Sequence, residues 1–597
     1  MNFGLFNFEK TARVKIIKFC ILYATSCLIT MSYSVVAEEV NTRFDLLLVG
    51  GALKTCSSMA PSNCTNNIFN HKQKSTTLYQ LNDKNRQKFN NTAGFINLSS
   101  KQKMQLNEII QHIYANAAGR IVNLPQLRQL FEQANGLTLY QTLDDSVYFA
   151  LLDSFEYQQL DENALRKQEV SSLSHTLNQS AIEIYQRFVQ QAAIRQPSEQ
   201  IKPKIAVITA SSRDPFEVAD FYQSIFTEAG AEVIWLPLDT TYQQARDLEL
   251  KGQEGCSQLS TLRAQNNSYY REDIYPQRTA LQRQFCMQPE KMLSALSQVQ
   301  GVFFNGGDQS LTLSALLLVD GSDSPELNII KQQVKAGKLI VGGTSAGTAV
   351  QAGGVTATLP VPMLTNGDSA NALDRGAFAN QPPSQRCMAQ TGCGLGMQIG
   401  DLTYRAEGGT GLFNLGLLDT HFSERDRETR LAIFSAVSRQ RLAFGIDETT
   451  ALLVGGLEQN KVLQLEVIGQ NGVFIVDRQQ HQYSRASNNS DASHEHVVVA
   501  ALAHYLNAGS HAQYDAVKQQ LTFDLAGQRL VAAQPLQVLD QGRWRDEIRT
   551  VCGTRESISW TQFNNHYQLT PSAQTLFYHE PLRGHCSYVN LAFSISN

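Results

Sequence analysis

Three short apolar runs, each ending in a pair of glycines, constrain the fold of this chain more than any other feature. The runs span residues 44–49, 302–304 and 338–341, and the glycine pairs that follow are Gly50-Gly51, Gly306-Gly307 and Gly342-Gly343. Each run predicts a buried strand that passes into a tight turn. The chain therefore has at least three strand ends at which the backbone turns sharply.

The segments around these runs place helices between strands. Residues 205–210 and 232–236 read as two further strands, with a helix over 221–229 between them. Helical patterns also follow the second and third glycine pairs. Strand, helix and strand in this order predict a parallel α/β sheet. In such sheets the ligand site lies at the carboxyl ends of the strands, so the glycine-rich turns are where we expect a functional site.

Two regions do not follow this pattern. A polar stretch rich in Asn and Gln follows Gly51, and amphipathic patterns near 104–115 and 181–194 predict a helical insertion at about 52–200. The 597 residues exceed the ~250–300 at which one hydrophobic core stops growing. We therefore expect one large α/β domain over 38–455, containing the insertion, and a C-terminal extension over 456–597 that carries no readable motif.

The N-terminus has the pattern of an export signal. Basic residues precede an apolar stretch over 21–36, and small residues at 35–37 suit cleavage before Glu38. This predicts a signal peptide over 1–37 and a secreted or periplasmic protein. An uncleaved anchor and a degenerate lipoprotein site at Cys27 are the alternatives. No later stretch approaches the roughly 20 apolar residues that span a bilayer, so no membrane span is expected after cleavage.

Eight cysteines lie beyond the signal region, and an even set in an exported chain favours disulfides. Connectivity does not follow from sequence, but the local grouping favours 56–64, 256–286, 387–393 and 552–586. None of these cysteines forms a Cys-x-x-Cys pair, and His494 and His496 are two residues apart, a spacing that diverges on strand or helix. We therefore expect no metal and no cofactor.

The net charge of -4 and the 17% of charged residues are those of an ordinary globular protein. Nucleic-acid binding needs a basic surface, for which this balance offers no global basis. Nucleic acid is therefore not expected as a partner. Whether the chain forms a homodimer stays open.

The strongest chemical motif is Gly343-Thr344-Ser345-Ala346-Gly347, a Gly-x-Ser-x-Gly segment between a predicted strand and a predicted helix. Such a turn presents the serine at the edge of the sheet, and the helix N-terminus supplies amide donors for an oxyanion. A purely structural glycine-rich turn is the alternative. The strand-turn-helix context favours Ser345 as a nucleophile.

A serine of ordinary pKa needs a base, and the base needs a partner that orients it. His421 lies in Asp419-Thr420-His421-Phe422, with three spaced arginines just after it. A further apolar run over 442–446 delivers Asp447 and Glu448 at another predicted strand end. His421 is therefore the candidate base.

Taken together, these motifs resemble cyanophycinase, a relative of dipeptidase E in the class I glutamine amidotransferase-like superfamily. The resemblance rests on the Gly-Gly-Asp-Gln turn at 306–309, Gly-Gly-Thr-Ser-Ala-Gly at 342–347, Asp-x-His-Phe with its arginines, and Gly-Ile-Asp-Glu-Thr-Thr-Ala at 445–451. It covers about 44–454, interrupted by the insertion. It implies a flavodoxin-like parallel sheet flanked by helices.

The resemblance also implies roles for individual residues. Ser345 would be the nucleophile, His421 the general base and then acid, and Glu448 the group that orients the imidazole. The backbone amides of Gly307 and Ala346 would form the oxyanion hole. The residues implied in substrate binding are Gln309, Asp419, Arg425, Arg427 and Arg430.

The implied activity is that of an exported serine exopeptidase that hydrolyses cyanophycin, a polyaspartate with arginine on each side-chain carboxyl, to β-Asp-Arg dipeptides through an acyl-enzyme. Three arginines suit a carboxylate near the scissile bond. The alternative for Arg427 and Arg430 is pairing with Glu424, Asp426 and Glu428 on a solvated helix face.

Three other functions stay open. Thr420 stands where the family has Gln, and the insertion and extension are unusual, so other aspartyl or isoaspartyl peptides are alternative substrates. An α/β-hydrolase esterase shares the serine turn, although in that fold the acid precedes the histidine. A catalytically silent protein that binds acidic peptides is the third alternative.

Overall fold

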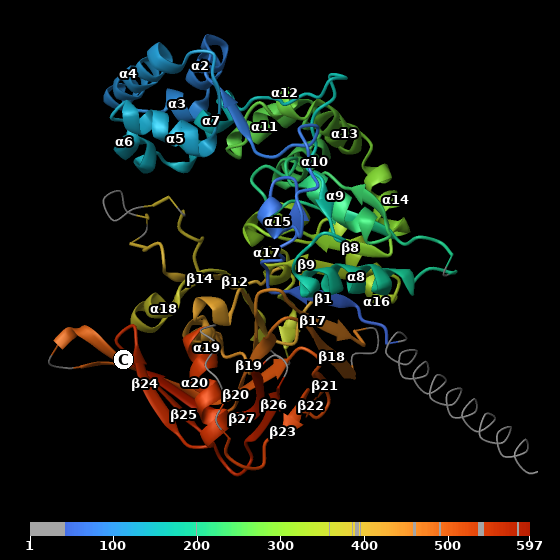
Figure 1. Cartoon of the computed structure of the whole chain (residues 1–597), viewed down its shortest axis with the longest axis vertical. Coiled ribbons are helices and arrows are strands. Elements are labelled where there is room, and N and C mark those ends of the chain that lie inside the picture. Colours follow the sequence, from blue (N-terminus) through green and yellow to red (C-terminus); the bar gives the residue numbers. More distant parts are fainter. Residues whose placement is uncertain are drawn as a thin grey trace, which may run out of the picture. The chain divides into compact units, whose positions relative to one another are not determined.

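The computed structural model describes residues 42–597 except 199, 357–358, 385, 388–392, 395, 458–460, 489–490, 535, 537–541 and 582–583, and it describes no side chains at 487–488 and 491–495. The predicted signal peptide lies outside the described residues. Residues 45–597 form one compact unit, a mixed α/β structure with two large sheets (Figure 1). Within the described residues, no helix is both long and apolar enough to cross a membrane.

The main sheet has nine strands in the order β22-β21-β18-β17-β1-β9-β8-β6-β7, in which β21 is His511–Asp515 and β22 is Gln520–Asp524. The five strands at one end of this order, β1-β9-β8-β6-β7, are parallel and mostly buried, as the apolar runs predict. They are β1 (Leu46–Val49), β6 (Lys204–Ile208), β7 (Glu232–Trp235), β8 (Gly301–Phe304) and β9 (Ile340–Thr344). The predicted parallel α/β core is therefore confirmed.

The order of the parallel strands fixes where a ligand crevice opens. From β6 the chain moves to β7 on one side, and then to β8 and β9 on the other. The strand order thus reverses between β6 and β8, while β1, the first strand in the chain, pairs with β9. Crevices in open parallel sheets lie outside the carboxyl ends at such a reversal.

Helices cover both faces of the parallel core. On one face, α8 (Gln179–Ala193) and α9 (Ala219–Glu228) bury Phe188 and Phe226 against Phe303. Successive strand residues point to opposite faces, so Val302 and Phe304 pack instead with α14 (Pro289–Gln298) and α16 (Pro325–Lys335). The sheet is therefore a buried layer between helices.

The chain between β1 and α8 forms a helical cluster with its own hydrophobic core. The cluster contains α4, which confirms the helix expected near 104–115, whereas α8 packs on the main sheet. Its helices are α2 (Asp83–Asn90), α3 (Ala93–Ile96), α4 (Ser100–Ala117), α5 (Leu124–Gln133), α6 (Leu137–Thr142) and α7 (Asp145–Phe155).

Buried charges attach this helical cluster to the α/β core. Arg271, from α12 (Arg271–Ile274), is fully buried and lies 2.6 Å from Glu156 and 2.6 Å from Asp214. Glu156 follows α7, and Asp214 lies in the loop after β6. Because an unpaired buried charge is costly, these contacts favour one arrangement of the cluster on the core.

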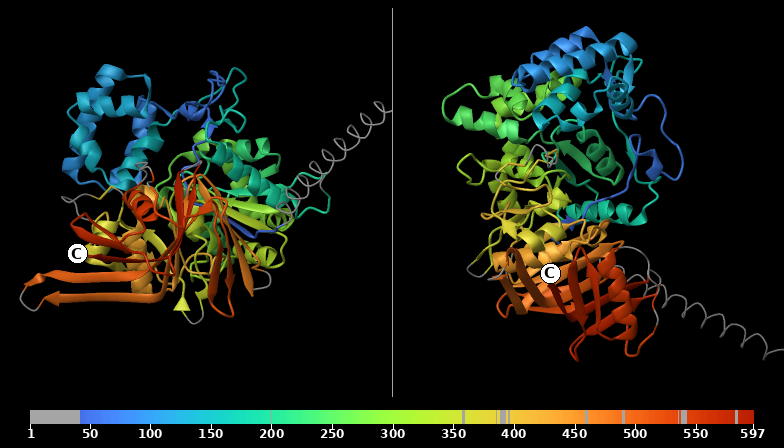
Figure 2. Two further views of the ribbon diagram at one scale, coloured as in Figure 1. Left: turned by 60° about the horizontal axis from the view of Figure 1, so that its bottom comes forward. Right: turned by 90° about the vertical axis from the view of Figure 1, so that its left-hand side faces the viewer.

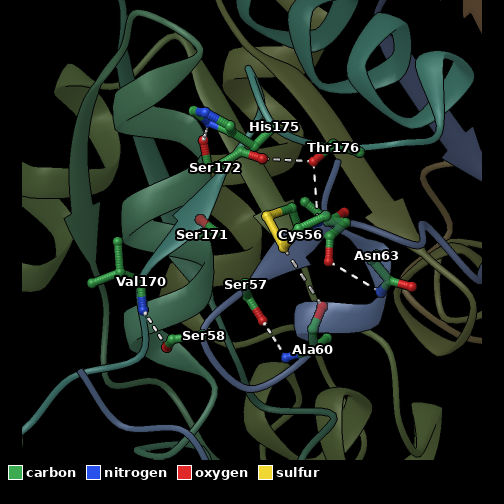
Figure 3. Close-up of a disulfide and its surroundings, with 12 residues drawn as sticks. Cys56, Ser57, Ser58, Ala60, Asn63, Val170, Ser171, Ser172, His175 and Thr176 are labelled. Carbon is green, nitrogen blue, oxygen red and sulfur yellow. Dashed lines mark hydrogen bonds between the residues drawn. A yellow bond between two sulfur atoms is a disulfide. The ribbon is translucent and has the colours of Figure 1, made fainter. Parts of the chain in front are cut away.

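All four predicted disulfides are present: Cys56–Cys64, Cys256–Cys286, Cys387–Cys393 and Cys552–Cys586. Figure 3 shows the first, just after the Gly50-Gly51 turn. There β2 (Cys56–Ser57) pairs with β5 (Ser171–Ser172), and the Cys56 amide donates to the Thr176 hydroxyl at 3.0 Å. This disulfide and its hydrogen bonds anchor the chain where it leaves β1.

The second large sheet follows the order β15-β16-β19-β20-β27-β25-β24. Strands β15 (Leu417–Thr420) and β16 (Leu442–Ile446) are parallel, and the rest pair antiparallel. The long β19–β20 hairpin is visible in Figure 2. The other strands in this order are β19 (Gly472–Asn488), β20 (Asp491–Asn507), β24 (Ile558–Gln562), β25 (Asn565–Thr570) and β27 (His585–Ser596). Beside β27 the sheet also contains β26 (Leu576–Glu580), which pairs with β23 (Gln528–Arg529).

Residues beyond 455 complete both sheets. Strand β18 (Val462–Gly469) pairs with β17 (Thr450–Gly455) in the main sheet, and β19 pairs with β16 in the second. The boundary expected between 455 and 456 thus falls between two paired strands. Helix α20 (Arg543–Thr554) is joined to β27 by Cys552–Cys586.

Candidate active site

Ser345 lies on a strained turn between β9 and the short helix α17 (Ala346–Ala349). Its φ of 53° and ψ of -114° are unfavourable for a residue with a Cβ. A Cβ at Gly343 or Gly347 would overlap backbone carbonyl groups, so only glycine fits on either side. The Thr348 hydroxyl donates to the carbonyls of Val49 and Gly343. The turn is therefore held tightly with Ser345 at its tip.

The structure brings Ser345, His421 and Glu448 into one hydrogen-bonded line. His421 Nε2 lies 2.8 Å from Ser345 Oγ, and His421 Nδ1 lies 2.7 Å from Glu448 Oε1. His421 directly follows β15, and Glu448 is the second residue after the end of β16. Because these strands are parallel neighbours, with Thr420 opposite Ile446, their carboxyl ends deliver both side chains to the same edge.

The Gly50-Gly51 turn supports this line from β1. The His421 amide donates to the Gly50 carbonyl at 2.8 Å, and the Thr449 amide donates to the Gly51 carbonyl at 2.8 Å. A Cβ at Gly51, whose φ is +114°, would overlap the His421 imidazole. The sequence predicts a tight turn here but not this role. The only hint is that the turn ends a strand of the parallel core.

The predicted oxyanion-hole residues lie on two turns around Ser345. Ala346 begins α17, directly after the serine. A Cβ at Gly306 would lie 3.4 Å from the Ser345 Cβ, so this turn lies against the nucleophile. Gly307, at φ +145°, leaves no room for a Cβ beside the Ser211 carbonyl, to which the Asp308 amide donates. Both turns are fixed by backbone contacts.

The environment of His421 favours its neutral form. Burial lowers the pKa of His421 below its ordinary value, and the nearby Arg425 adds to this effect, while Glu448 opposes it. A neutral imidazole can accept a proton from a serine hydroxyl. The arrangement can therefore activate Ser345 by general-base chemistry.

Two predicted substrate residues, Arg425 and Gln309, differ in how far other groups of the protein already bind them. The Arg425 guanidinium is 3.8 Å from Glu448, and its side chain is 51% exposed, which leaves it accessible to a ligand. Gln309 begins α15 (Gln309–Leu316), and its amide nitrogen donates to the carbonyls of Leu364 and Thr365 at 2.8 and 3.0 Å. Gln309 thus fixes the turn after Gly307 to the neighbouring strand β12 (Met363–Asn366).

The other three predicted substrate residues pair with one another. Asp419 is buried and accepts from Arg430 Nε at 2.7 Å, and Arg427 lies 3.7 Å from the same carboxylate. Burial raises the pKa of Asp419, but Arg430 outweighs this and holds that pKa below its ordinary value. Burial, and then Arg430, lowers the pKa of Arg427 to about 9. The alternative of a solvated helix face is wrong for Arg430, which is buried.

Sequence reasoning missed Arg545, and it missed the contacts by which Glu424 and Asp447 hold the segments of Glu448 and His421. Glu424 Oε2 accepts the backbone amide of Glu448 at 3.0 Å. Arg545 lies 3.0 Å from Glu424 and 3.1 Å from Asp447. Arg545 belongs to α20, in the region that carries no motif, so no sequence pattern indicated it.

A cavity of about 640 Å³ opens beside α15. Its lining includes Ser310, which follows Gln309, and Thr365, whose carbonyl accepts from Gln309, together with Arg405 and Glu407. Within the described residues, no group of three His, Cys, Asp or Glu side chains could hold a metal. The side chains of His494 and Glu495 lie outside the description.

The chain is similar in sequence to cyanophycinases, which confirms the resemblance. It is 34% identical to the cyanophycinase of Synechococcus elongatus over 195 residues, covering 33% of this chain and 47% of that protein. It is 29% identical to that of Trichormus variabilis over 276 residues (46% of this chain and 64% of that protein), and 28% identical to that of Geminocystis herdmanii over 280 residues (47% and 71%). The chain therefore spans about half the length of the first of these relatives.

No family model matches the chain. Among solved structures, a peptidase from an acI-B1 Actinobacterium aligns with 50% of this chain and 86% of its own, at 14% identity and a TM-score of 0.28. That likeness is too weak to bear on the fold.

Proposed function

We propose that this chain is a serine peptidase that cleaves cyanophycin to β-Asp-Arg dipeptides, with Ser345 as nucleophile, His421 as general base and Glu448 as the orienting acid. The observation that carries the proposal is the unbroken line of two short contacts, 2.8 and 2.7 Å, through His421. The sequence similarity to cyanophycinases supports the choice of substrate.

In the proposed reaction, Ser345 Oγ attacks the scissile carbonyl carbon as His421 Nε2 takes the hydroxyl proton. Glu448 accepts a hydrogen bond from the Nδ1–H of His421 and stabilises the imidazolium without taking its proton. The amides of Gly307 and Ala346 donate to the tetrahedral oxyanion. His421 then protonates the leaving amine, which departs and leaves an acyl-enzyme. Water, deprotonated by His421, releases the second product and restores Ser345.

Substrate recognition is assigned chiefly to Arg425. Because the side-chain carboxyls of cyanophycin are in amide linkage, its free anions are the α-carboxylates of the attached arginines, and an accessible guanidinium binds such a planar anion with two hydrogen bonds. Arg425 is half exposed and 3.8 Å from Glu448, so it can meet an anion beside the scissile bond. Gln309 would contact the substrate from the opposite turn. Asp419, Arg427 and Arg430, which pair with one another, would form the floor of this site.

The esterase alternative is disfavoured by chain order. In α/β-hydrolases the acid precedes the histidine, whereas the acid that bonds His421 is Glu448, which follows it. Two other acids, Asp401 and Asp419, are bonded to Arg375 and Arg430 respectively. We propose that the parallel core β7-β6-β8-β9-β1 is the flavodoxin-like sheet of the glutamine amidotransferase-like superfamily.

Export is proposed together with this activity. The four disulfides favour an oxidising compartment, which agrees with the N-terminal signal pattern. No cofactor enters the proposed reaction.

The test compares the purified protein with its Ser345→Ala variant on insoluble cyanophycin, with soluble products identified by mass spectrometry. We expect Asp-Arg dipeptides from the first protein and none from the second. A fluorophosphonate probe, which reacts only with an activated serine, separates the two parts of the proposal. Labelling of Ser345 without dipeptide release would overturn the substrate, and a folded protein that takes up no probe would overturn the serine mechanism in favour of a silent binding protein.

A further inference from the structure

Arg545, Glu424 and Asp447 form a buried ion cluster next to the segments that carry His421 and Glu448. Its cation, Arg545, comes from the C-terminal region. Arg545, on α20, places one guanidinium nitrogen 3.0 Å from Glu424 and the other 3.1 Å from Asp447. The side chains of Arg545 and Asp447 are 8% and 0% exposed. One planar guanidinium thus bridges two carboxylates out of contact with most solvent.

Each of these carboxylates holds the backbone of the opposite segment. Glu424, three residues after His421, accepts the amide of Glu448 at 3.0 Å. Asp447, one residue before Glu448, accepts the amide of Ser423 at 2.8 Å. The segment that carries the base therefore fixes the acid, and the segment that carries the acid fixes the base. Arg545 lies between the two carboxylates and contacts both.

The carboxylates require a cation because they lie close to each other and to Glu448. Burial, and then the charge of Asp447, raises the pKa of Glu424 to about 7, while Arg545 acts in the opposite direction. The Tyr505 hydroxyl donates to Asp447, and the side-chain amide of Asn471 donates to Glu424 at 3.0 Å. Hydrogen bonds thus fix the carboxylates, and Arg545 compensates their charge.

Further contacts fix α20 itself against the base segment. A Cβ at Gly542, just before the helix, would overlap the Ser423 carbonyl, so the two backbones are in direct contact. The Arg543 amide donates to Asp426 at 2.9 Å. Phe422 stacks on Phe474, which in turn packs edge-on against Trp544. The position of Arg545 is therefore set by the same loop that it bridges.

We propose that Arg545 is a positioning residue for catalysis. By bridging Glu424 and Asp447, it keeps His421 and Glu448 at the separation that activates Ser345. This inference rests on the proposed function, since it assigns the C-terminal region a part in the same site. Catalytic groups displaced by about 1 Å lose on the order of 100-fold in rate, so the expected effect is on turnover rather than on substrate binding.

The test uses the full-length protein with Arg545→Gln, Arg545→Lys and a matched control, Arg549→Gln. Arg549 lies one turn along the same helix and is also buried, but it bonds Asp546 and the Gly584 carbonyl. For Arg545→Gln we expect kcat and the fluorophosphonate labelling rate to fall about 10- to 100-fold, with KM within about threefold. Arg545→Lys keeps the charge but cannot bridge both carboxylates in a plane, so it should recover only part of the rate.

The control separates positioning from stability. Arg549→Gln should lower the melting temperature while folded protein keeps its kcat. A folded Arg545→Gln protein with unchanged kcat, or two variants with the same loss of kcat, would overturn the inference. If Arg545→Gln does not fold, Glu424→Gln removes the same ion pair by changing the carboxylate instead. We then expect the same loss of kcat, and an unchanged kcat would overturn the inference. A wild-type protein that is not labelled at all contradicts the proposed function instead.

Discussion

The nucleophile and the base of the candidate site are held by two different kinds of interaction. On the main sheet, Ser345 is fixed by backbone contacts at Gly343 and Gly347 that leave no room for a Cβ. On the second sheet, His421 and Glu448 are fixed by Glu424, Asp447 and Arg545, a buried set of charges. The first side should respond to added volume, and the second to changed charge. Close packing tolerates little extra volume, and buried charges tolerate no missing partner.

The largest effect is expected from changing charge on the base side, in Glu448→Gln. The glutamine amide would donate to His421 Nδ1 and force the hydrogen onto Nε2, which could then no longer accept from Ser345. We expect kcat to fall about 10³- to 10⁴-fold, the scale of the same change in other serine peptidase triads. Steady-state kinetics on an aspartyl peptide measures it.

The matched control is Asp401→Asn, which alters an acid that precedes the histidine in the chain. Asp401 bonds Arg375 and Asn371 instead. Folded Asp401→Asn protein should keep its turnover. If Asp401→Asn reduces kcat more than Glu448→Gln does, the assignment of the orienting acid is wrong.

Added volume should act next most strongly, in Gly51→Ala. The new methyl group would overlap the His421 imidazole and push it from Ser345 without changing any charge. A displacement of this kind costs on the order of 100-fold in kcat. Gly230→Ala is the control, since Gly230 has a similar φ of +106° but open space around it. Equal losses in the two variants would show that backbone strain, and not contact with the imidazole, is responsible.

A pH profile of Ser345 labelling tests how the charges around His421 set its pKa. Because burial and Arg425 lower the pKa of His421, the neutral base persists below pH 6.5. Labelling of Ser345 should therefore rise with pH and reach half of its maximum below 6.5. In Arg425→Ala the pKa rises and the half-maximum moves to higher pH. A half-maximum at higher pH in the wild type, or no movement in the variant, would contradict this account of the base.

How far sequence could predict the site follows the same division. The turn at Ser345 was predictable because its determinants, an apolar strand, two flanking glycines and a helix start, lie within a few residues of one another. The order of strands and helices followed from local periodicity in the same way. Gly51 was visible as a turn, but its contact with His421 depends on how two distant strand ends meet.

The base side was only partly predictable because its partners are remote in sequence. Arg545 is 98 positions from Asp447 and belongs to an ordinary amphipathic helix, so no local pattern marks it. The pairing of Asp419 with Arg430 was missed for a different reason. The sequence shows a charged residue at a strand end, but it does not show whether a ligand or another side chain compensates that charge. The sequence pattern changes near 455, but strands before this point pair with strands after it, so the change is not a boundary in the fold.

The smallest effect on turnover is expected from two disulfides with similar loops. Cys552–Cys586 joins residues 34 apart and anchors α20, which carries Arg545, whereas Cys256–Cys286 joins residues 30 apart between β7 and β8 in the chain, away from α20. Replacing either pair by serines should cost about 2–4 kcal/mol of stability, because loops of similar length lose similar chain entropy. Thermal melting measures this shared loss. Only the first replacement loosens the helix behind His421 and Glu448, so only it should lower kcat of the folded protein, by a few-fold. A loss of kcat in both variants, or in neither, would show that α20 does not transmit its position to the base.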